Sequence, residues 1–232
     1  IVSGNATAIV YGNLLTISPD LDFNGTIDVN VSVTDGFLVD SGSFILNINA
    51  VNDAPTFEII ESQIVDEDSS ITISLSANDV DGDDIYFGAD TDGNSSLSLD
   101  GNLLTITPDL NFSGSIIVSV SATDTQESSS QSFNLEVTPI NDAPILELVS
   151  NQNILEDEIF SYLLQASDVD EDILDFSLSL DGNAIYTIEN NLLTITPMEN
   201  WYGTINAIVT ASDEELSDSD DFTLTVESVN DA

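Results

Sequence analysis

The sequence predicts an all-β chain of tandem antiparallel β-sandwiches, and three observations lead to this fold class. Apolar and polar residues alternate in short runs such as Ile71 to Ser76, which is the period of a half-buried strand. Asp-Gly pairs and Ser-rich stretches separate these runs, and no segment shows sustained helical periodicity. Several motifs also recur at a spacing of 89 residues, which indicates repeated domains of one kind.

Within one repeat the strand-like runs follow each other at short intervals. After Ile71 to Ser76 come Leu104 to Thr107, Ile116 to Val120 and Phe133 to Val137, each with alternating apolar residues. About seven short strands in about 90 residues are typical of an immunoglobulin-like antiparallel sandwich. We therefore expect tandem sandwiches of this kind with an 89-residue period.

The domain boundaries follow from a junction motif that occurs three times. Val51-Asn52-Asp53-Ala54-Pro55 recurs as Ile140-Asn141-Asp142-Ala143-Pro144 and again as Val229-Asn230-Asp231-Ala232. Proline removes a hydrogen-bond donor and fixes φ, which suits a short and stiff linker. The sequence thus predicts the C-terminal part of a repeat at 1–55 and complete repeats at 56–144 and 145–232.

The composition excludes several classes of function. The chain has 43 acidic residues and no Lys, Arg or His, so its net charge is −43. It therefore lacks the cations that grip nucleic acid or anionic lipid. Without His and Cys it also lacks the residues of Ser-His-Asp catalysis and of tetrahedral zinc sites. Because 41% of its residues are apolar, the chain is not a disordered acidic tail, and no apolar run approaches the ~18 residues of a membrane span.

Some of the acids recur at the ends of the repeats and could gather there. Asp79 and Asp81, like Asp168 and Asp170, directly follow a predicted strand, and residues i and i+2 of a strand face the same side. Converging carboxylates repel one another, and this chain has no basic residue to pair with them. Oxygen-rich clusters suit Ca²⁺ better than Mg²⁺, which retains its water. We favour Ca²⁺ at the linkers over the alternative that these acids are simply solvated.

At these residues the sequence resembles tandem bacterial cadherin-like repeats of large extracellular adhesin and matrix proteins. The resemblance covers essentially the whole chain and rests on the junction motif, on the pairs Glu67-Asp68 and Glu156-Asp157, and on a Pro-x-x-x-Phe/Trp-x-Gly pattern. That pattern occurs at Pro19, Phe23 and Gly25, at Pro108, Phe112 and Gly114, and at Pro197, Trp201 and Gly203.

The resemblance implies a set of calcium ligands for each junction. For the first junction it implies Asp20, Asp22, Asn52, Asp53, Asp79, Asp81 and Asp124. For the second it implies Glu67, Asp109, Asn141, Asp142, Asp168, Asp170 and Asp213. Only the upstream half of a third set, Glu156 and Asn200, is present.

The function expected from these observations is a calcium-rigidified spacer of an extracellular, cell-surface adhesin. Two alternatives stay open, a filament or biofilm-matrix subunit whose partial repeat 1–55 is completed by strand exchange, and a polysaccharide-binding module that uses exposed rings such as Tyr202. Catalysis is not expected, because every candidate acid recurs in the next repeat. The expected partners are neighbouring repeats, copies of the same protein or a polysaccharide, but neither nucleic acid nor an inserted membrane.

Overall fold

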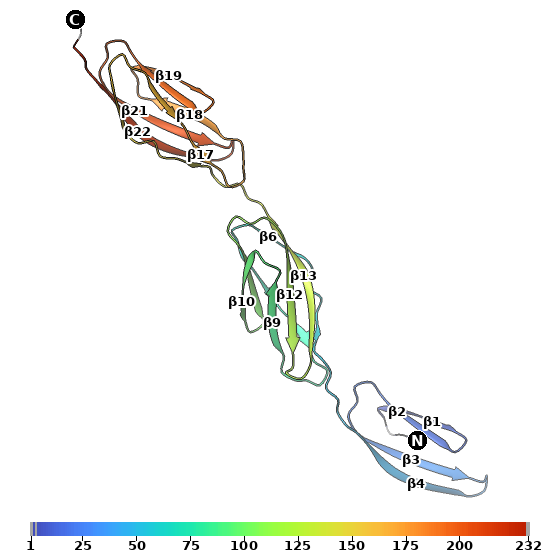
Figure 1. Cartoon of the computed structure of the whole chain (residues 1–232). Helices are drawn as coiled ribbons and strands as arrows, with labels where there is room; N and C mark the ends of the chain where they lie inside the picture. Colours follow the sequence, from blue (N-terminus) through green and yellow to red (C-terminus); the bar gives the residue numbers. More distant parts are fainter. Residues whose placement is uncertain (1, 3, 231–232) are drawn as a thin grey trace. The chain divides into compact units, whose positions relative to one another are not determined.

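The computed structural model describes residue 2 and residues 4–230, and it confirms the predicted all-β class. Every regular element of these residues is a β-strand (Figure 1). The chain divides into two compact units, Ile1–Thr138 and Pro139–Ala232. The described part of the chain contains no helical segment with the length and apolar content that a membrane span requires.

The first unit begins with two β-hairpins. Strands β1 (Ala6–Tyr11) and β2 (Leu14–Pro19) form one antiparallel pair, and β3 (Gly25–Thr34) and β4 (Val39–Ile48) form a longer one. The turn between β1 and β2 contains Gly12 at φ 65°, a conformation that glycine adopts at no steric cost.

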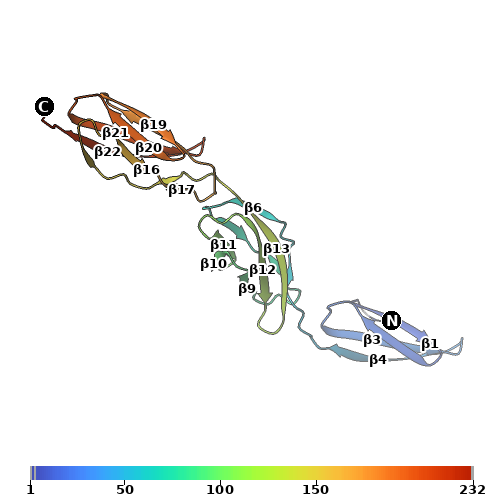
Figure 2. The same ribbon diagram turned by 45° about the horizontal axis from the view of Figure 1, so that its top comes forward.

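The rest of the first unit is a complete sandwich. Its strands are β5 (Thr56–Phe57), β6 (Gln63–Asp66), β7 (Ile71–Ser74), β8 (Ala77–Asn78), β9 (Tyr86–Thr91), β10 (Ser95–Asp100), β11 (Leu103–Pro108), β12 (Gly114–Thr123) and β13 (Ser128–Thr138). One sheet has the order β6-β13-β12-β9 and the other β10-β11-β7, while β5 pairs with β8. Figure 2 shows the same strands from a second direction.

The second unit repeats this arrangement. Its strands are β14 (Ile145–Leu146), β15 (Gln152–Leu155), β16 (Phe160–Leu163), β17 (Ala166–Ser167), β18 (Asp175–Leu180), β19 (Ala184–Glu189), β20 (Leu192–Pro197), β21 (Gly203–Ser212) and β22 (Ser217–Glu227). Its sheets have the orders β15-β22-β21-β18 and β16-β20-β19, and β14 pairs with β17.

The strand count and the pairing differ in detail from the prediction. Each sandwich has nine strands instead of about seven, because the first two strands of each are broken into short pieces. In the first sandwich β5 pairs with β8, whereas β6 pairs with β13 and β7 pairs with β11. The β6–β13 and β15–β22 pairs are parallel, so the sandwiches are not wholly antiparallel.

Each sandwich buries the apolar residues that alternate along its strands. In the first, Leu104, Ile106, Ile116 and Leu135 have no exposed surface. In the second, Leu193, Ile195, Ile205 and Leu224 are buried to the same extent. The alternation in the sequence thus corresponds to one face on the core and one face in solvent.

The two hairpins of residues 6–48 have only part of this cover, since Ile27 and Val29 of β3 are buried but other apolar residues are not. Val31, Val33 and Phe44 are 43%, 69% and 48% exposed. On the matching pair β12–β13 of the complete sandwich, Val120, Ala122 and Phe133 are at most 5% exposed. Among the described residues, β3 and β4 form a two-stranded sheet, to which Val2 adds an isolated bridge with Val29, whereas β12 and β13 are flanked by β9 and β6 in a four-stranded sheet.

Candidate metal centre

Asp79 lies directly after β8, and its carboxylate turns back onto its own loop. Its Oδ1 accepts hydrogen bonds from the backbone N–H groups of Asp81, Gly82 and Asp83 at 2.9, 3.1 and 3.3 Å. Its Oδ2 is buried and accepts no hydrogen bond from any residue that the structure describes. One oxygen of this carboxylate is therefore saturated and the other is left without a donor.

Asp168 has a similar arrangement in the second unit, with fewer hydrogen bonds. Its Oδ1 accepts a hydrogen bond from the backbone N–H of Asp170 at 2.9 Å. Its Oδ2 is again buried without a hydrogen bond among the described residues. The recurrence in a second sandwich indicates that the arrangement is a property of the Asp-x-Asp loop.

The linker segment before each complete sandwich is hydrogen-bonded to the Asp-x-Asp loop and to a second acid of the same unit. In the first unit the backbone N–H of Asp53 donates to Oδ2 of Asp81 at 2.9 Å, and Nδ2 of Asn52 donates to Oδ2 of Asp124 at 2.6 Å. Gln126, which was not among the predicted residues, donates from Nε2 to Oδ1 of Asn52 at 2.8 Å.

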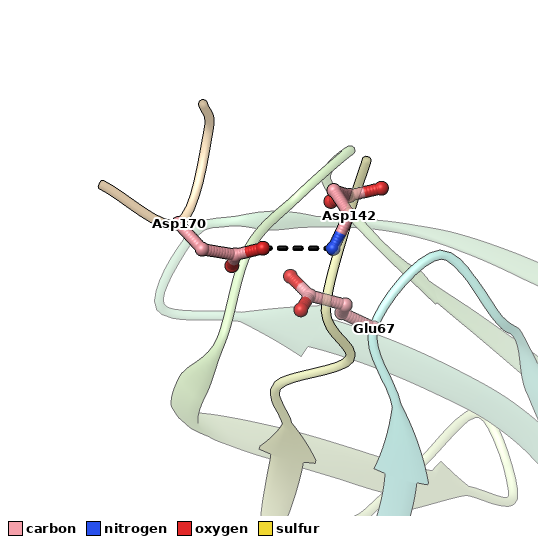
Figure 3. Close-up of side chains that lie close together, drawn as sticks. All are labelled: Glu67, Asp142 and Asp170. Carbon is pink, nitrogen blue, oxygen red and sulfur yellow. Dashed lines mark hydrogen bonds between the residues drawn. The ribbon is translucent and has the colours of Figure 1, made fainter. Parts of the chain in front are cut away.

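The second unit contains the matching contacts. The backbone N–H of Asp142 donates to Oδ2 of Asp170 at 2.8 Å (Figure 3). Nδ2 of Asn141 donates to Oδ2 of Asp213 at 2.9 Å. Four of the predicted ligands of this unit therefore lie in two directly bonded pairs.

Asp124 and Asp213 are buried acids whose charge is stabilised by donors. The backbone N–H groups of Gln126 and Glu127 donate to Oδ1 of Asp124 at 2.7 Å each. Hydrogen bonds from Glu127 and from the Asn52 side chain favour the ionised form and hold the pKa of Asp124 below its ordinary value. The pKa of Asp213 is lowered in the same way, by Leu216 and then by Asn141.

Asp53 has the opposite electrostatic environment. Partial loss of hydration raises its pKa, and the negative charges of Asp22, Asp81 and Asp79 raise it further. Asp22, Asp53 and Asp81 also line a cavity of about 260 Å³. At this place the neighbouring acids of the first predicted set disfavour the charged form of Asp53.

A third acid joins the predicted pair in the second unit. Asp168, Asp170 and Asp172 each have a carboxylate oxygen within 4.8 Å of the other two. Asp168 and Asp170 were predicted from the sequence as metal ligands, whereas Asp172 was not. Continuation of the i, i+2 spacing was the signal that could have identified it.

The other predicted ligands lie on neighbouring loops of the first unit. The backbone N–H of Asp20 donates to the Asn5 carbonyl at 2.9 Å, and that of Asp109 donates to the Asn94 carbonyl at 2.8 Å. Glu67 is only 5% exposed, and its backbone N–H donates to the Thr138 carbonyl at 2.9 Å. The second predicted set is thus divided, with Glu67 and Asp109 in the first unit and the other five residues in the second.

Two further acids shape these loops and were not predicted as site residues. Oδ1 of Asp68 accepts the backbone N–H of Asn111 at 2.9 Å, and Oδ1 of Asp157 accepts that of Asn200 at 2.9 Å. They hold the turn that follows the repeated proline. Asp68 and Asp157 belong to the Glu67-Asp68 and Glu156-Asp157 pairs of the sequence, and this was the signal that could have identified them. Glu156, of the incomplete third set, is 8% exposed and accepts a hydrogen bond from the backbone N–H of Val229.

Tyr202, which is a candidate for polysaccharide binding, differs in exposure from the adjacent Trp201. Trp201 packs against the core of the second sandwich, whereas Tyr202 is 64% exposed. Of these two rings, only that of Tyr202 is accessible to a binding partner.

Comparison with known proteins supports the fold. Residues 52–137 match the family described as the bacterial Ig domain. Mouse protocadherin-24 EC1-3 is similar in structure with a TM-score of 0.50 and 16% identity, over 98% of this chain and 89% of that one. Human protocadherin-24 EC1-2 gives a TM-score of 0.50 and 16% identity over 78% of this chain and 100% of that one.

Other comparisons contribute less. An endo-fucoidan hydrolase of glycoside hydrolase family 107 aligns with 98% of this chain at 14% identity, but this chain spans only 38% of its length and the TM-score is 0.35. No curated protein matches the sequence. The bacterial Ig family and the cadherin-like fold are typically non-enzymatic and usually extracellular.

Proposed function

Because this chain consists of bacterial immunoglobulin-like and cadherin-like β-sandwiches, we propose that it is a calcium-binding repeat segment of an extracellular adhesin. In this proposal Ca²⁺ binds where the linkers meet the Asp-x-Asp loops, and it stiffens the linkers so that the segment acts as a spacer. The observation that carries the proposal is the buried Oδ2 of Asp79 and of Asp168, which accepts no hydrogen bond among the described residues.

A buried carboxylate oxygen without a donor is costly, because it has lost its water and gained nothing in return. A basic side chain would be the usual remedy, but the sequence has none. A bound cation therefore accounts for these oxygens best. The donor set contains oxygen alone, which fits the six to eight ligands that Ca²⁺ takes, whereas Mg²⁺ retains several waters.

The proposed ligands come from within each unit. In the first unit they are Asp53, whose pKa is raised by loss of hydration and then by neighbouring negative charges, and the acids that supply those charges, Asp22, Asp81 and Asp79. In the second unit they are Asp142 and the group formed by Asp168, Asp170 and Asp172. Binding would replace repulsion between these carboxylates by attraction to one ion.

The proposed mechanical role follows from the linker contacts. Residues 52–53 are already attached to Asp124 and Asp81 by hydrogen bonds. A cation that binds Asp53 and Asp81 together adds a stronger and less flexible connection at the same place. The linker then has fewer conformations, which is what a spacer requires.

Thermal unfolding of the full chain tests this proposal. Trp201 is the single tryptophan, and it lies in the second unit, so its fluorescence reports on that sandwich. We expect Ca²⁺ to raise the melting temperature above that in EDTA. A ligand at 100 times its dissociation constant stabilises by about 2.7 kcal/mol, and 1 kcal/mol shifts the melting temperature of a domain of this size by about 4–8 °C.

Two substitutions separate binding from general charge effects. Asp168→Asn is expected to lose most of the calcium-dependent shift, and in EDTA it should be at least as stable as the unchanged protein because repulsion is relieved. Asp221→Asn removes the same charge from an exposed position of β22 and should keep the full shift. Equal melting temperatures in Ca²⁺ and EDTA, at matched ionic strength, would show that the proposal is wrong.

A further inference from the structure

We propose that Asn24 is a site of spontaneous deamidation, and that the product adds a carboxylate to the cavity lined by Asp22, Asp53 and Asp81. The first part is independent of metal binding. The second part, an effect on calcium affinity, rests on the proposed function.

The sequence singles out Asn24 among the asparagines of the chain. Asn24-Gly25 is the only Asn-Gly pair in the 232 residues. Glycine has no Cβ, so the Gly25 nitrogen can approach the Asn24 side chain with no side chain of its own in the way. Other asparagines precede residues that carry a Cβ, such as Asn94 before Ser95 and Asn183 before Ala184.

The structure leaves Asn24 free to react. It lies in the loop between β2 and β3, is exposed, and makes no side-chain hydrogen bond among the described residues. Gly25 has φ 123°, a conformation that other residues rarely adopt. The Asn24 side chain is therefore exposed and not held by a hydrogen bond among the described residues, while Gly25 is the first residue of β3 and pairs with Ile48.

Deamidation at this position requires water as its only co-reactant. The backbone nitrogen of Gly25 attacks Cγ of Asn24 and forms a five-membered succinimide ring, while the side-chain nitrogen leaves as ammonia. Water then opens the ring at either carbonyl. The products are aspartate and isoaspartate at position 24, each with a new negative charge, and no bond is oxidised or reduced.

The location of Asn24 gives this charge a consequence. Asn24 lines the cavity of about 260 Å³ together with Asp22, Asp53 and Asp81. The negative charges of Asp22 and Asp81 already act unfavourably on that of Asp53. Because calcium affinity increases with the number of charged oxygen ligands, a further carboxylate in the wall should strengthen binding. Without calcium it should add to the repulsion.

Mass spectrometry of the aged full-length chain tests the reaction. The chain is incubated at neutral pH and digested with chymotrypsin, since it has no trypsin site. We expect the peptide that contains Asn24 to gain about one dalton, through replacement of an amide by a carboxyl group, faster than the peptides that contain Asn94 or Asn183. Asn24→Gln is the control and should show no such gain, because it cannot form the five-membered ring. A rate at Asn24 no greater than at Asn94 would overturn the proposal.

Calcium titration tests the consequence with Asn24→Asp as the mimic of the aspartate product. Its dissociation constant for Ca²⁺ is expected to fall severalfold relative to the unchanged protein, and an unchanged or higher value would refute the second part. If the unchanged protein and Asn24→Asp both fail to bind Ca²⁺, the proposed function and the affinity effect are refuted, while the mass measurement still decides the reaction at Asn24.

Discussion

Asp213 shows how a carboxylate can stabilise a fold in a chain without cations. It is 9% exposed, and its Oδ1 accepts the backbone N–H groups of Glu215 and Leu216 at 2.7 and 2.6 Å. Its Oδ2 accepts Nδ2 of Asn141 at 2.9 Å. Backbone and amide donors thus take the place that Lys or Arg would occupy elsewhere.

Replacing Asp213 with Ala should therefore destabilise the second unit. Hydrogen bonds to charged groups contribute about 1.5–3 kcal/mol, so we expect a loss of that order in urea unfolding monitored by Trp201 fluorescence. Asp221→Ala, an exposed acid of the same strand region, is the control and should change stability little. A loss no larger than that of the control would contradict this role of Asp213.

The lowered pKa of Asp213 also predicts part of the pH dependence of stability. Its folded-state pKa is lowered, so its stabilisation is complete above the unfolded value of about 3.9 and is lost as the pH falls through the folded value. Asp213→Ala should accordingly show a shallower loss of stability on acidification than the unchanged protein.

Gly203 carries a second residue-scale prediction. It has φ 148°, and a Cβ at this position would lie 2.8 Å from Cζ2 of Trp201. Gly182 has a comparable φ of 122°, but its Cβ would meet nothing within 4 Å. Both Gly→Ala changes impose backbone strain of about 1–3 kcal/mol.

Gly203→Ala must in addition displace the Trp201 ring from the core. We therefore expect it to lower the melting temperature, measured by circular dichroism, more than Gly182→Ala does. Equal decreases would mean that the Trp201 contact adds nothing to the strain.

At the scale of elements, strand alternation determines which leucines matter. In β20, Leu193 has no exposed surface, whereas its neighbour Leu192 is 43% exposed. Large-to-small substitutions of buried leucine cost about 2–5 kcal/mol. We expect Leu193→Ala to lose that much in urea unfolding followed by Trp201 fluorescence, and Leu192→Ala much less; similar losses would mean that the strand does not present one face to the core.

Acidic side chains of β22 accept hydrogen bonds from the backbone at the start of the second unit. Oδ2 of Asp218 accepts the backbone N–H of Leu146 at 2.9 Å, and Oδ2 of Asp220 accepts that of Val149 at 2.8 Å. In the first unit the Gln131 side chain binds the backbone of Glu58 and Ile60 instead. Some acids of this chain therefore hold backbone in place and are not only solvated surface charges.

At the scale of the whole molecule, charge has one sign. The net charge is −43, and no Lys, Arg or His side chain is present to form an attractive pair. Interactions between side-chain charges are therefore repulsive, and salt screens them over about 8 Å at 0.15 M ionic strength. Screening should relieve this self-repulsion.

We accordingly expect the melting temperature in EDTA to rise steadily as NaCl is added. Calcium at the same ionic strength should raise it further, because specific binding adds to screening. A melting temperature that falls with NaCl would show that attractive electrostatic interactions outweigh this repulsion.

The sequence by itself determined the all-β class, because strand periodicity is local and is visible in any short run. It also determined that carboxylates and five tyrosines are the only ionisable side chains available for a site, because the chain has no Lys, Arg, His or Cys. Strand spacing grouped the Asp-x-Asp pairs, but the other proposed ligands could be grouped with them only by resemblance, since Asp53 and Asp81 or Asn52 and Asp124 are far apart in sequence.

Only the tertiary structure decided which oxygens meet. Sheet pairing divides the first strands into short pieces, and the fold brings each Asp-x-Asp loop to the linker. It also distinguishes Asp124, whose carboxylate is supplied with donors, from Asp79, whose Oδ2 has none among the described residues. These differences depend on burial and on distant donors, which no local pattern of residues encodes.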